Sequence, residues 1–174
     1  MSKLKYGLDI DGPIALFTEG FYEYFNEPFV QPTTWDDPFI RDNFHKIVDD
    51  DKFWLSLKPT CKPEDIVFEV SAYITARPCK SELTAEWLFM HGFPVAPVIT
   101  VGIKPDGTHH TKVNAILDNQ IDIFYDDAPH HFEEVSMHCL CFLHDAPYNQ
   151  HIFTPNRLTS IKEIKRWKRH EVMV

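Results

Sequence analysis

Runs of hydrophobic residues alternate with amphipathic stretches along most of the chain. The runs are short and end at turn residues or charged clusters, so each predicts a β-strand. Strands are expected over residues 4–10, 66–75, 95–101, 121–125 and 137–143. Apolar residues at helical spacing predict helices over residues 80–91, 112–117, 130–135 and 158–170. Strands that alternate with helices indicate an α/β fold with a parallel sheet flanked by helices.

The segment 14–65 breaks this alternation, because it is rich in aromatic and acidic residues and contains several prolines. It is interrupted by Pro28, Pro32, Pro38 and Pro59. Proline ends or kinks a helix, so the segment predicts several short helices rather than a layer of the sheet. We therefore expect a core formed by residues 1–13 and 66–174, with residues 14–65 inserted as a small helical unit.

Length, charge and composition narrow the class of protein. A chain of 174 residues with 44% hydrophobic residues suits one globular domain. A formal net charge of -9 repels the phosphate backbone of nucleic acid, so we expect no long nucleic-acid partner. The first residues lack the apolar stretch of a signal peptide, and no run of about 18 apolar residues occurs. The expectation is a cytoplasmic protein without a membrane segment.

Polar clusters with catalytic potential follow the predicted strands or open a predicted helix. They are the segments 9–12, 74–78, 111–112 and 126–127. In a parallel sheet the carboxyl ends of neighbouring strands lie at one edge, where α/β proteins bind their ligands. We therefore expect Asp9, Thr75 and Asp126 to meet at that edge, although they are far apart in the sequence.

The acidic residues of these clusters suggest a metal-assisted reaction at phosphate. A phosphate monoester is a dianion, so a carboxylate that attacks it needs a cation between the two. Asp9, Asp126 and Asp127 offer the carboxylate oxygens that Mg²⁺ prefers. The expected cofactor is therefore Mg²⁺.

The remaining polar residues complete a set of groups for phosphoryl transfer. Asp9 can attack phosphorus and form an aspartyl-phosphate, which divides one difficult step into two. Asp11 can protonate the leaving oxygen and later deprotonate water. The hydroxyl of Thr75 and the ammonium of Lys112 can stabilise the phosphoryl oxygens, although neither residue type is informative by itself.

In order and spacing, the four clusters resemble the four motifs of the haloacid dehalogenase-like (HAD) phosphatase superfamily. The pattern is Asp-x-Asp-Gly at residues 9–12, a threonine at the end of a strand, a lysine on a helix and an acidic pair after an apolar strand. The resemblance implies a Rossmann-like core, Mg²⁺ dependence and metal ligation by Asp9, the backbone carbonyl of Asp11 and Asp126. Asp127 is expected to stand beside these ligands.

A closer resemblance is to the 5'(3')-deoxyribonucleotidases and their bacterial and phage relatives. These proteins carry a small helical cap where this chain has residues 14–65. Local matches are Phe17, the pair Phe53-Trp54 and the segment 145–149. By this resemblance Phe17, Phe53 and Trp54 would surround a nucleobase, and stacking on an aromatic ring contributes ~1–3 kcal/mol per base. The alternative, in which these aromatic residues form the core of the cap itself, stays open.

The second cluster departs from the nucleotidase pattern. It has Thr75-Ala76-Arg77 where those proteins tend to have Thr-Ser, so one hydroxyl contact to phosphate is missing. We expect Ala76 and Arg77 at the substrate, with Arg77 in place of the missing hydroxyl. His130 and His131 directly follow the segment 126–129, which contains the acidic pair, and are candidates to line the same site.

The sequence thus predicts a hydrolase of phosphoric monoesters, most simply a 5'(3')-nucleotidase for nucleoside monophosphates. Two other functions remain open. One is hydrolysis of another small phosphorylated metabolite or of polynucleotide ends, and the other is nucleotide binding without catalysis. The expected partner is a small phosphate monoester, and a homodimer is left open.

Overall fold

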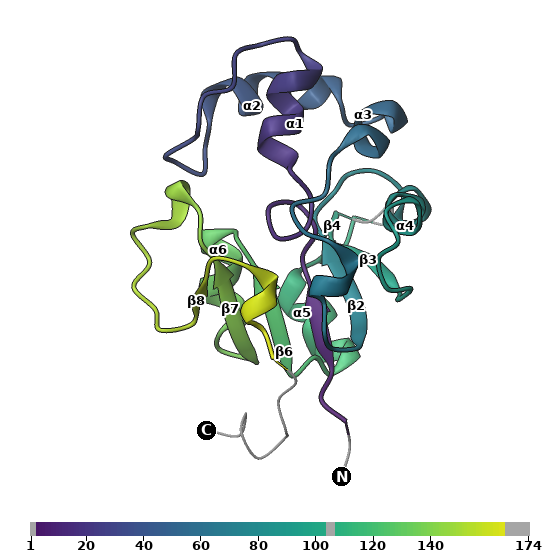
Figure 1. Cartoon of the computed structure of the whole chain (residues 1–174), viewed down its shortest axis with the longest axis vertical. Helices are drawn as coiled ribbons and strands as arrows, with labels where there is room; N and C mark the ends of the chain where they lie inside the picture. Colours follow the sequence, from purple (N-terminus) through teal and green to yellow (C-terminus); the bar gives the residue numbers. More distant parts are fainter. Residues whose placement is uncertain (1–2, 104–106, 166–174) are drawn as a thin grey trace.

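The computed structural model describes residues 3–103 and 107–165, and its centre is a six-stranded parallel sheet (Figure 1). The strands are β1 (Tyr6–Leu8), β2 (Val70–Thr75), β3 (Val98–Thr100), β6 (Ile123–Asp126), β7 (Leu140–His144) and β8 (Arg157–Leu158). Their spatial order is β3-β2-β1-β6-β7-β8, so β1 lies in the middle of the sheet. A separate antiparallel pair joins β4 (Gly102–Ile103) to β5 (His109–His110).

Helices cover both faces of the sheet. They are α4 (Ser81–Met90), α5 (Lys112–Asn119) and α6 (Pro129–Val135). Neighbouring residues of a strand point to opposite faces, which divides the core into two clusters. Ile74 and Phe124 pack with residues of α5 and α6, whereas Tyr73 and Tyr125 pack with residues of α4. The predicted α/β class is confirmed, because a parallel sheet with both faces covered is the Rossmann-like arrangement.

Residues 14–65, called the cap below, form the helical unit between β1 and β2. Its helices are α1 (Phe17–Tyr24), α2 (Pro38–Asn43) and α3 (Asp51–Ser56), with short 3-10 turns at Phe44–Lys46 and Pro63–Asp65. Figure 1 shows α1, α2 and α3 grouped at one end of the molecule, beyond the sheet. The buried rings of Phe21 and Phe53 lie at the centre of this group, 5.9 Å apart between centroids.

Contacts on two sides of the cap hold it on the core. On one side the indole Nε1 of Trp87 in α4 donates to the carbonyl of Leu57, just after α3, at 2.8 Å. On the other side Trp35, in the loop before α2, meets the rings of His130 and Tyr148 edge to face at 5.3 and 5.4 Å. The cap is therefore anchored at both margins of the cleft between the two units.

The predicted elements from the first strand to the fifth are present, with boundaries that shift by a few residues. The helix predicted over residues 80–91 is α4, which ends at Met90. Gly92 follows two residues later, and its φ of +74° is typical of the glycine that terminates a helix. The strands β4, β5 and β8 were not expected. No helix within the described residues is long and apolar enough to cross a membrane.

The helix predicted over residues 158–170 is wrong in the part that the structure describes. Leu158 belongs to β8 and pairs with His144 of β7, while Ile161–Glu163 forms only a 3-10 turn. Both Ile161 and Ile164 are buried although the segment between them is only a 3-10 turn. Their spacing of three residues therefore does not indicate one face of an α-helix. Residues 166–170 of this prediction lie outside the described residues.

Replacement of Phe21 by alanine tests whether the aromatic cluster is a true core of the cap. Phe21 is fully buried, so Phe21→Ala should lower the free energy of unfolding by about 3–5 kcal/mol, measured by urea denaturation. The matched control is Phe89→Ala, because Phe89 is 76% exposed and its loss should change stability by no more than ~0.5 kcal/mol. Equal effects of the two substitutions would contradict the assignment.

Candidate active site

The carboxyl ends of three adjacent strands bring the predicted residues together. Asp9 follows β1, Thr75 ends β2 and Asp126 ends β6, and β1 pairs with both neighbours in parallel. The backbone N–H of Asp9 donates to the carbonyl of Tyr125 at 2.9 Å, which continues the pairing to the edge. Asp9, Thr75 and Asp126 therefore lie at the same edge of the sheet, as the sequence predicted.

A buried lysine joins two of the carboxylates. Lys112 Nζ lies 3.0 Å from Asp9 Oδ2 and 2.8 Å from Asp126 Oδ2, and all three side chains are almost completely buried. Lys112 opens α5, and Thr111 caps that helix by accepting a hydrogen bond from the Asn114 N–H at 3.1 Å. Burial alone would lower the pKa of Lys112, but Asp126 and Asp9 outweigh this effect and raise it. The ammonium is therefore charged.

Asp127 is the third buried carboxylate of the group. Tyr148 donates its hydroxyl proton to Asp127 Oδ2, and Asn149 donates to the Asp127 backbone carbonyl at 2.9 Å. The other carboxylate oxygen, Oδ1, is buried and has no hydrogen-bond partner within the described part of the chain. Burial and the neighbouring Asp126 raise the pKa of Asp127 to about 7.

The charges of this group fit a divalent cation. Carboxylate oxygens of Asp9, Asp126 and Asp127 lie within 4.8 Å of one another, and Lys112 supplies the ammonium that faces them. Burial, only partly opposed by Lys112, raises the pKa of Asp9 well above its usual range. Three carboxylates against one ammonium leave an excess of negative charge, and an unpartnered oxygen faces the same group. Hard oxygen ligands of this kind suit Mg²⁺.

Gly12 allows the loop after β1 to approach Asp127. Its φ is +93°, and a Cβ atom there would stand 2.1 Å from Asp127 Oδ2. A side chain at this position would therefore displace the carboxylate as well as strain the backbone.

Asp11 stands apart from the three carboxylates and pairs with Arg77. Arg77 Nη2 lies 2.6 Å from Asp11 Oδ1, and Nε lies 3.0 Å from Oδ2. Arg77 also donates its backbone N–H to the Thr75 hydroxyl oxygen at 3.3 Å. The structure therefore places Arg77 next to Asp11 and Thr75.

A cavity of about 200 Å³ opens over these groups, between the sheet edge and the cap. Its polar floor includes Asp9, Asp11, Thr75 and Lys112. Its aromatic wall consists of Phe17, Trp35, Phe44 and Trp54, all from the cap. A neighbouring cavity of about 210 Å³ shares part of this wall and reaches Asp127 and Tyr148.

Of the residues expected around the substrate, all but Phe53 line the cavity. Phe17, Trp54, Ala76 and Arg77 line the 200 Å³ cavity. Phe53 does not line it, and its fully buried ring packs against Phe17, Phe21, Tyr24 and Trp54 inside the cap. For Phe53, the alternative of a place in the cap core describes what is observed.

Trp35, Phe44 and Tyr148 also line these cavities, and sequence reasoning did not select them individually. Their only signal was membership of the aromatic insertion or of the segment after the fifth strand. His131, which was a candidate, lines the cavity with Nδ1 3.7 Å from Asp126 Oδ2. Burial lowers the pKa of His131 to about 3, so its imidazole is neutral.

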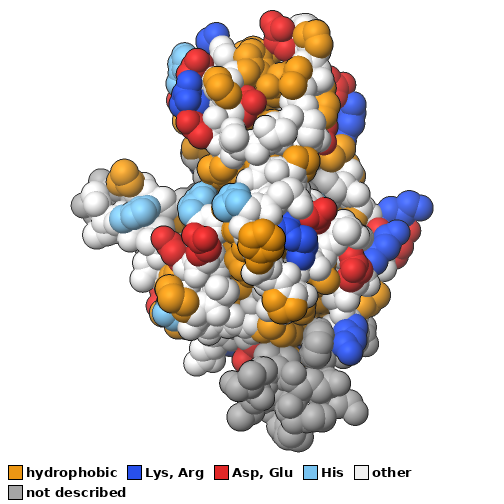
Figure 2. Space-filling model, turned by 90° about the vertical axis from the view of Figure 1, so that its left-hand side faces the viewer, with side chains coloured by type: hydrophobic (Ala, Val, Ile, Leu, Met, Phe, Trp, Pro, Cys, Tyr) orange, Lys and Arg blue, Asp and Glu red, His pale blue; other side chains and the backbone are white. Residues whose placement is uncertain are grey.

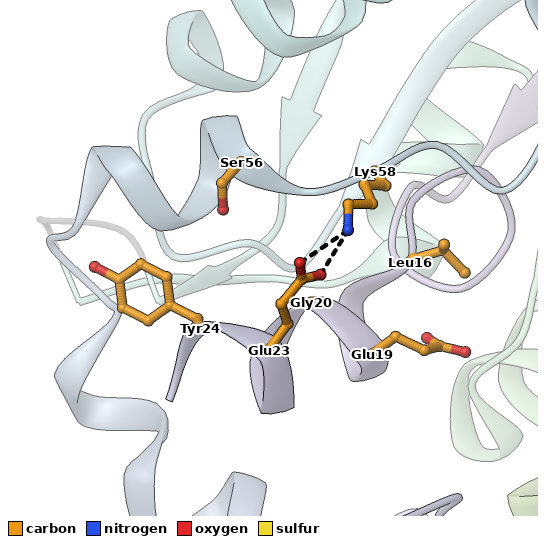
Figure 3. A pocket seen from close by; sticks show the side chains of 7 residues that line it. All are labelled: Leu16, Glu19, Gly20, Glu23, Tyr24, Ser56 and Lys58. Atoms are coloured by element: carbon orange, nitrogen blue, oxygen red, sulfur yellow. Dashed lines mark hydrogen bonds and ion pairs between the residues drawn. The ribbon is translucent and has the colours of Figure 1, made fainter. Parts of the chain in front are cut away.

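A larger cavity of about 430 Å³ lies elsewhere, on the outer side of the cap between α1 and the segment after α3. Figure 3 shows Glu23 and Lys58 joined across it, with Lys58 Nζ 2.8 Å from Glu23 Oε2. The side chains of this pair are 64% exposed, and no residue of the three-carboxylate group reaches the cavity. We therefore place the candidate active site at the sheet edge.

The molecular surface in Figure 2 bears on possible partners. Among the coloured side chains of that face, Lys and Arg lie scattered between Asp and Glu on both the cap and the core. They do not form a continuous basic strip on this face, and such a strip is the feature by which proteins track a nucleic-acid backbone.

Comparison with known proteins gives one informative likeness. No family model matches the chain. The chain is similar to a protein of Halalkalibacterium halodurans named "Putative nucleotidase BH1399", with 27% identical residues. The alignment covers 94% of this chain and 91% of the relative, so the likeness extends over the cap and the core together.

Replacement of Gly12 by alanine tests the close approach of the loop to Asp127. Gly12→Ala should destabilise the protein by more than the ~1–3 kcal/mol of backbone strain alone, because the new methyl group meets a carboxylate. Gly107→Ala is the matched control, since Gly107 has a similar φ of +81° and open space around it. Urea denaturation measures both, and equal losses of stability would show that the contact with Asp127 is unimportant.

Proposed function

We propose that the chain is a Mg²⁺-dependent phosphomonoesterase of the HAD type that removes phosphate from nucleoside monophosphates. The observation that carries this proposal is the group of three buried carboxylates with Lys112, set beneath a cavity with an aromatic wall. The name of the Halalkalibacterium halodurans relative supports a nucleotide as substrate. In this proposal residues 1–13 and 66–174 form the catalytic core, and the cap selects the substrate.

Asp9 is the proposed nucleophile. Its carboxylate is at the end of the central strand, lines the cavity and lies 3.0 Å from the Lys112 ammonium. Asp126, Asp9 and the backbone carbonyl of Asp11 would hold Mg²⁺, with Asp127 beside them. When bound, Mg²⁺ would reduce the repulsion between the phosphate dianion and the attacking carboxylate.

Asp11 is the proposed acid and base. It lines the same cavity as Asp9 but does not belong to the three-carboxylate group. Its carboxylate is therefore not among the proposed metal ligands and is available for proton transfer. Its proton would pass to the leaving oxygen, and it would later accept a proton from water. Lys112 and the Thr75 hydroxyl would stabilise the charge on the phosphoryl oxygens.

The aromatic wall supports a nucleoside as the leaving group. Phe17 is partly buried and lines the cavity, and the buried ring of Trp54 stacks against it with centroids 6.0 Å apart and an interplanar angle of 18°. A base stacked on such a surface gains about 1–3 kcal/mol. Arg77, which also lines the cavity, remains a candidate for contact with the substrate.

Phosphate release from a panel of phosphate esters tests the proposed function. With Mg²⁺, nucleoside and deoxynucleoside monophosphates should be hydrolysed faster than sugar phosphates, because only the nucleotides can stack on the aromatic wall. EDTA should abolish the release. Asp9→Asn should lower kcat by at least ~10³-fold, since the nucleophile is removed.

The Asp9→Asn protein also serves as the control for contaminating phosphatases. Unchanged release by this variant would show that the nucleophile assignment is wrong. Sugar phosphates that outpace every nucleotide would instead exclude the nucleotidase proposal and leave a phosphatase of another small metabolite.

Thermal unfolding with and without Mg²⁺ tests the metal site independently of activity. At pH 8, saturating Mg²⁺ should raise the Tm, since binding at 100 times Kd adds about 2.7 kcal/mol of stability. Asp127→Asn removes one uncompensated buried charge, so the metal-free variant should be more stable than the metal-free wild type and should gain less from Mg²⁺.

The matched control for that substitution is Asp36→Asn, because the Asp36 side chain is 70% exposed and forms its ion pair with Arg41 rather than with a residue of the buried group. Its Tm should follow that of the wild type in both conditions. A wild-type Tm that does not respond to Mg²⁺ would contradict the proposed cation site.

A further inference from the structure

Arg77 is a completely enclosed charged side chain beside the candidate active site. Its side chain has no exposed area, and its guanidinium lies 5.3 Å from the ring centres of both Trp54 and Trp87. Trp54 belongs to α3 of the cap and Trp87 to α4 of the core. The guanidinium is therefore held between one aromatic ring from each unit.

Both tryptophans are fixed in turn by hydrogen bonds to the backbone. Trp54 Nε1 donates to the carbonyl of Ile47 at 2.9 Å, and Trp87 Nε1 donates to that of Leu57 at 2.8 Å. Since both rings are immobilised and buried, the guanidinium between them has little freedom to turn. Arg77 is a rigid group that faces the cavity.

The two nitrogens of Arg77 that face Asp11 hold its carboxylate in one plane. Nε lies 3.1 and 3.0 Å from the two carboxylate oxygens, and Nη2 lies 2.6 Å from Oδ1. Among the described residues, Arg77 is the only group that the Asp11 carboxylate accepts hydrogen bonds from. A forked contact of this kind sets orientation as well as distance, which a lysine cannot do.

We propose that Arg77 is the positioning residue for Asp11, and that the Trp54–Trp87 pair makes this position depend on the seating of the cap. This inference rests on the proposed function and deepens it. Arg77 would act through Asp11 rather than bind phosphate in place of a missing hydroxyl. Its third nitrogen, Nη1, is buried with no hydrogen-bond partner in residues 3–103 and 107–165, so direct binding of phosphate is the competing role.

The chemistry of the two steps separates these roles. In the first step an Asp9 oxygen bonds to phosphorus, the bond from phosphorus to the ester oxygen breaks, and the Asp11 proton passes to that oxygen. In the second step a water oxygen bonds to phosphorus, its proton passes to Asp11, and the Asp9–phosphorus bond breaks to release phosphate. A nucleoside leaving group needs the Asp11 proton, whereas p-nitrophenolate leaves without it.

The test compares Arg77→Met with the wild type on a nucleoside monophosphate and on p-nitrophenyl phosphate. On the nucleotide, kcat should fall by about 10²–10⁴-fold with KM nearly unchanged, as for the loss of general acid catalysis. On p-nitrophenyl phosphate, one equivalent of nitrophenol should appear rapidly, followed by slow turnover, because only the second step still needs Asp11. Arg77→Lys should recover only part of the nucleotide activity.

Combination with Asp11→Asn decides between positioning and direct binding. If Arg77 acts through Asp11, the double variant should be no slower than Asp11→Asn alone. A further loss in the double variant, or a raised KM with unchanged kcat in Arg77→Met, would overturn the proposal in favour of direct binding of phosphate.

Crystal structures of Arg77→Met and Arg77→Lys provide a readout that does not depend on activity. Loss of the fork should leave the Asp11 carboxylate turned away from its place at the cavity, and an unmoved carboxylate would overturn the proposal. A wild-type protein that hydrolyses no phosphate ester would refute the proposed function, while these structures would still decide whether Arg77 holds Asp11. Unfolding curves confirm that each variant is folded.

Discussion

The structure depends on the burial of three carboxylates around one ammonium at the edge of the sheet. Asp9, Asp126 and Asp127 are almost fully buried with Lys112, although buried charges that are not fully paired cost several kcal/mol. A contribution to stability therefore does not explain this group. Its excess of negative charge is the observation on which the proposed cation site rests, and burial together with neighbouring carboxylates raises the pKa of both Asp9 and Asp127.

The elements around the three carboxylates hold these side chains in place. The central position of β1 sets Asp9 between the ends of β2 and β6, and Tyr148 and Asn149 hold Asp127 from a segment that follows β7. The cap then closes an aromatic wall over the charged floor. Arg77 connects the core to the cap, because it pairs with Asp11 of the core and lies over the ring of Trp54 of the cap.

Much of the core could be predicted because its signals are local. Apolar runs predicted the buried strands, and polar clusters at their ends predicted that Asp9, Thr75 and Asp126 would meet. The failures arose where tertiary contacts override local spacing. Leu158 pairs with β7 instead of starting a helix. Phe53 and Trp54, adjacent in the sequence, are both buried, and of the two only Trp54 lines the cavity. The forked contact between Asp11 and Arg77 joins residues 66 positions apart, so no local pattern could reveal it.

The most direct test of this account is anomalous X-ray diffraction from crystals grown with Mn²⁺, a scattering substitute for Mg²⁺. The account predicts one strong anomalous peak among the carboxylate oxygens of Asp9, Asp126 and Asp127. Crystals in which the ion lies elsewhere, or in which these carboxylates remain without an ion at saturating Mn²⁺, would contradict it.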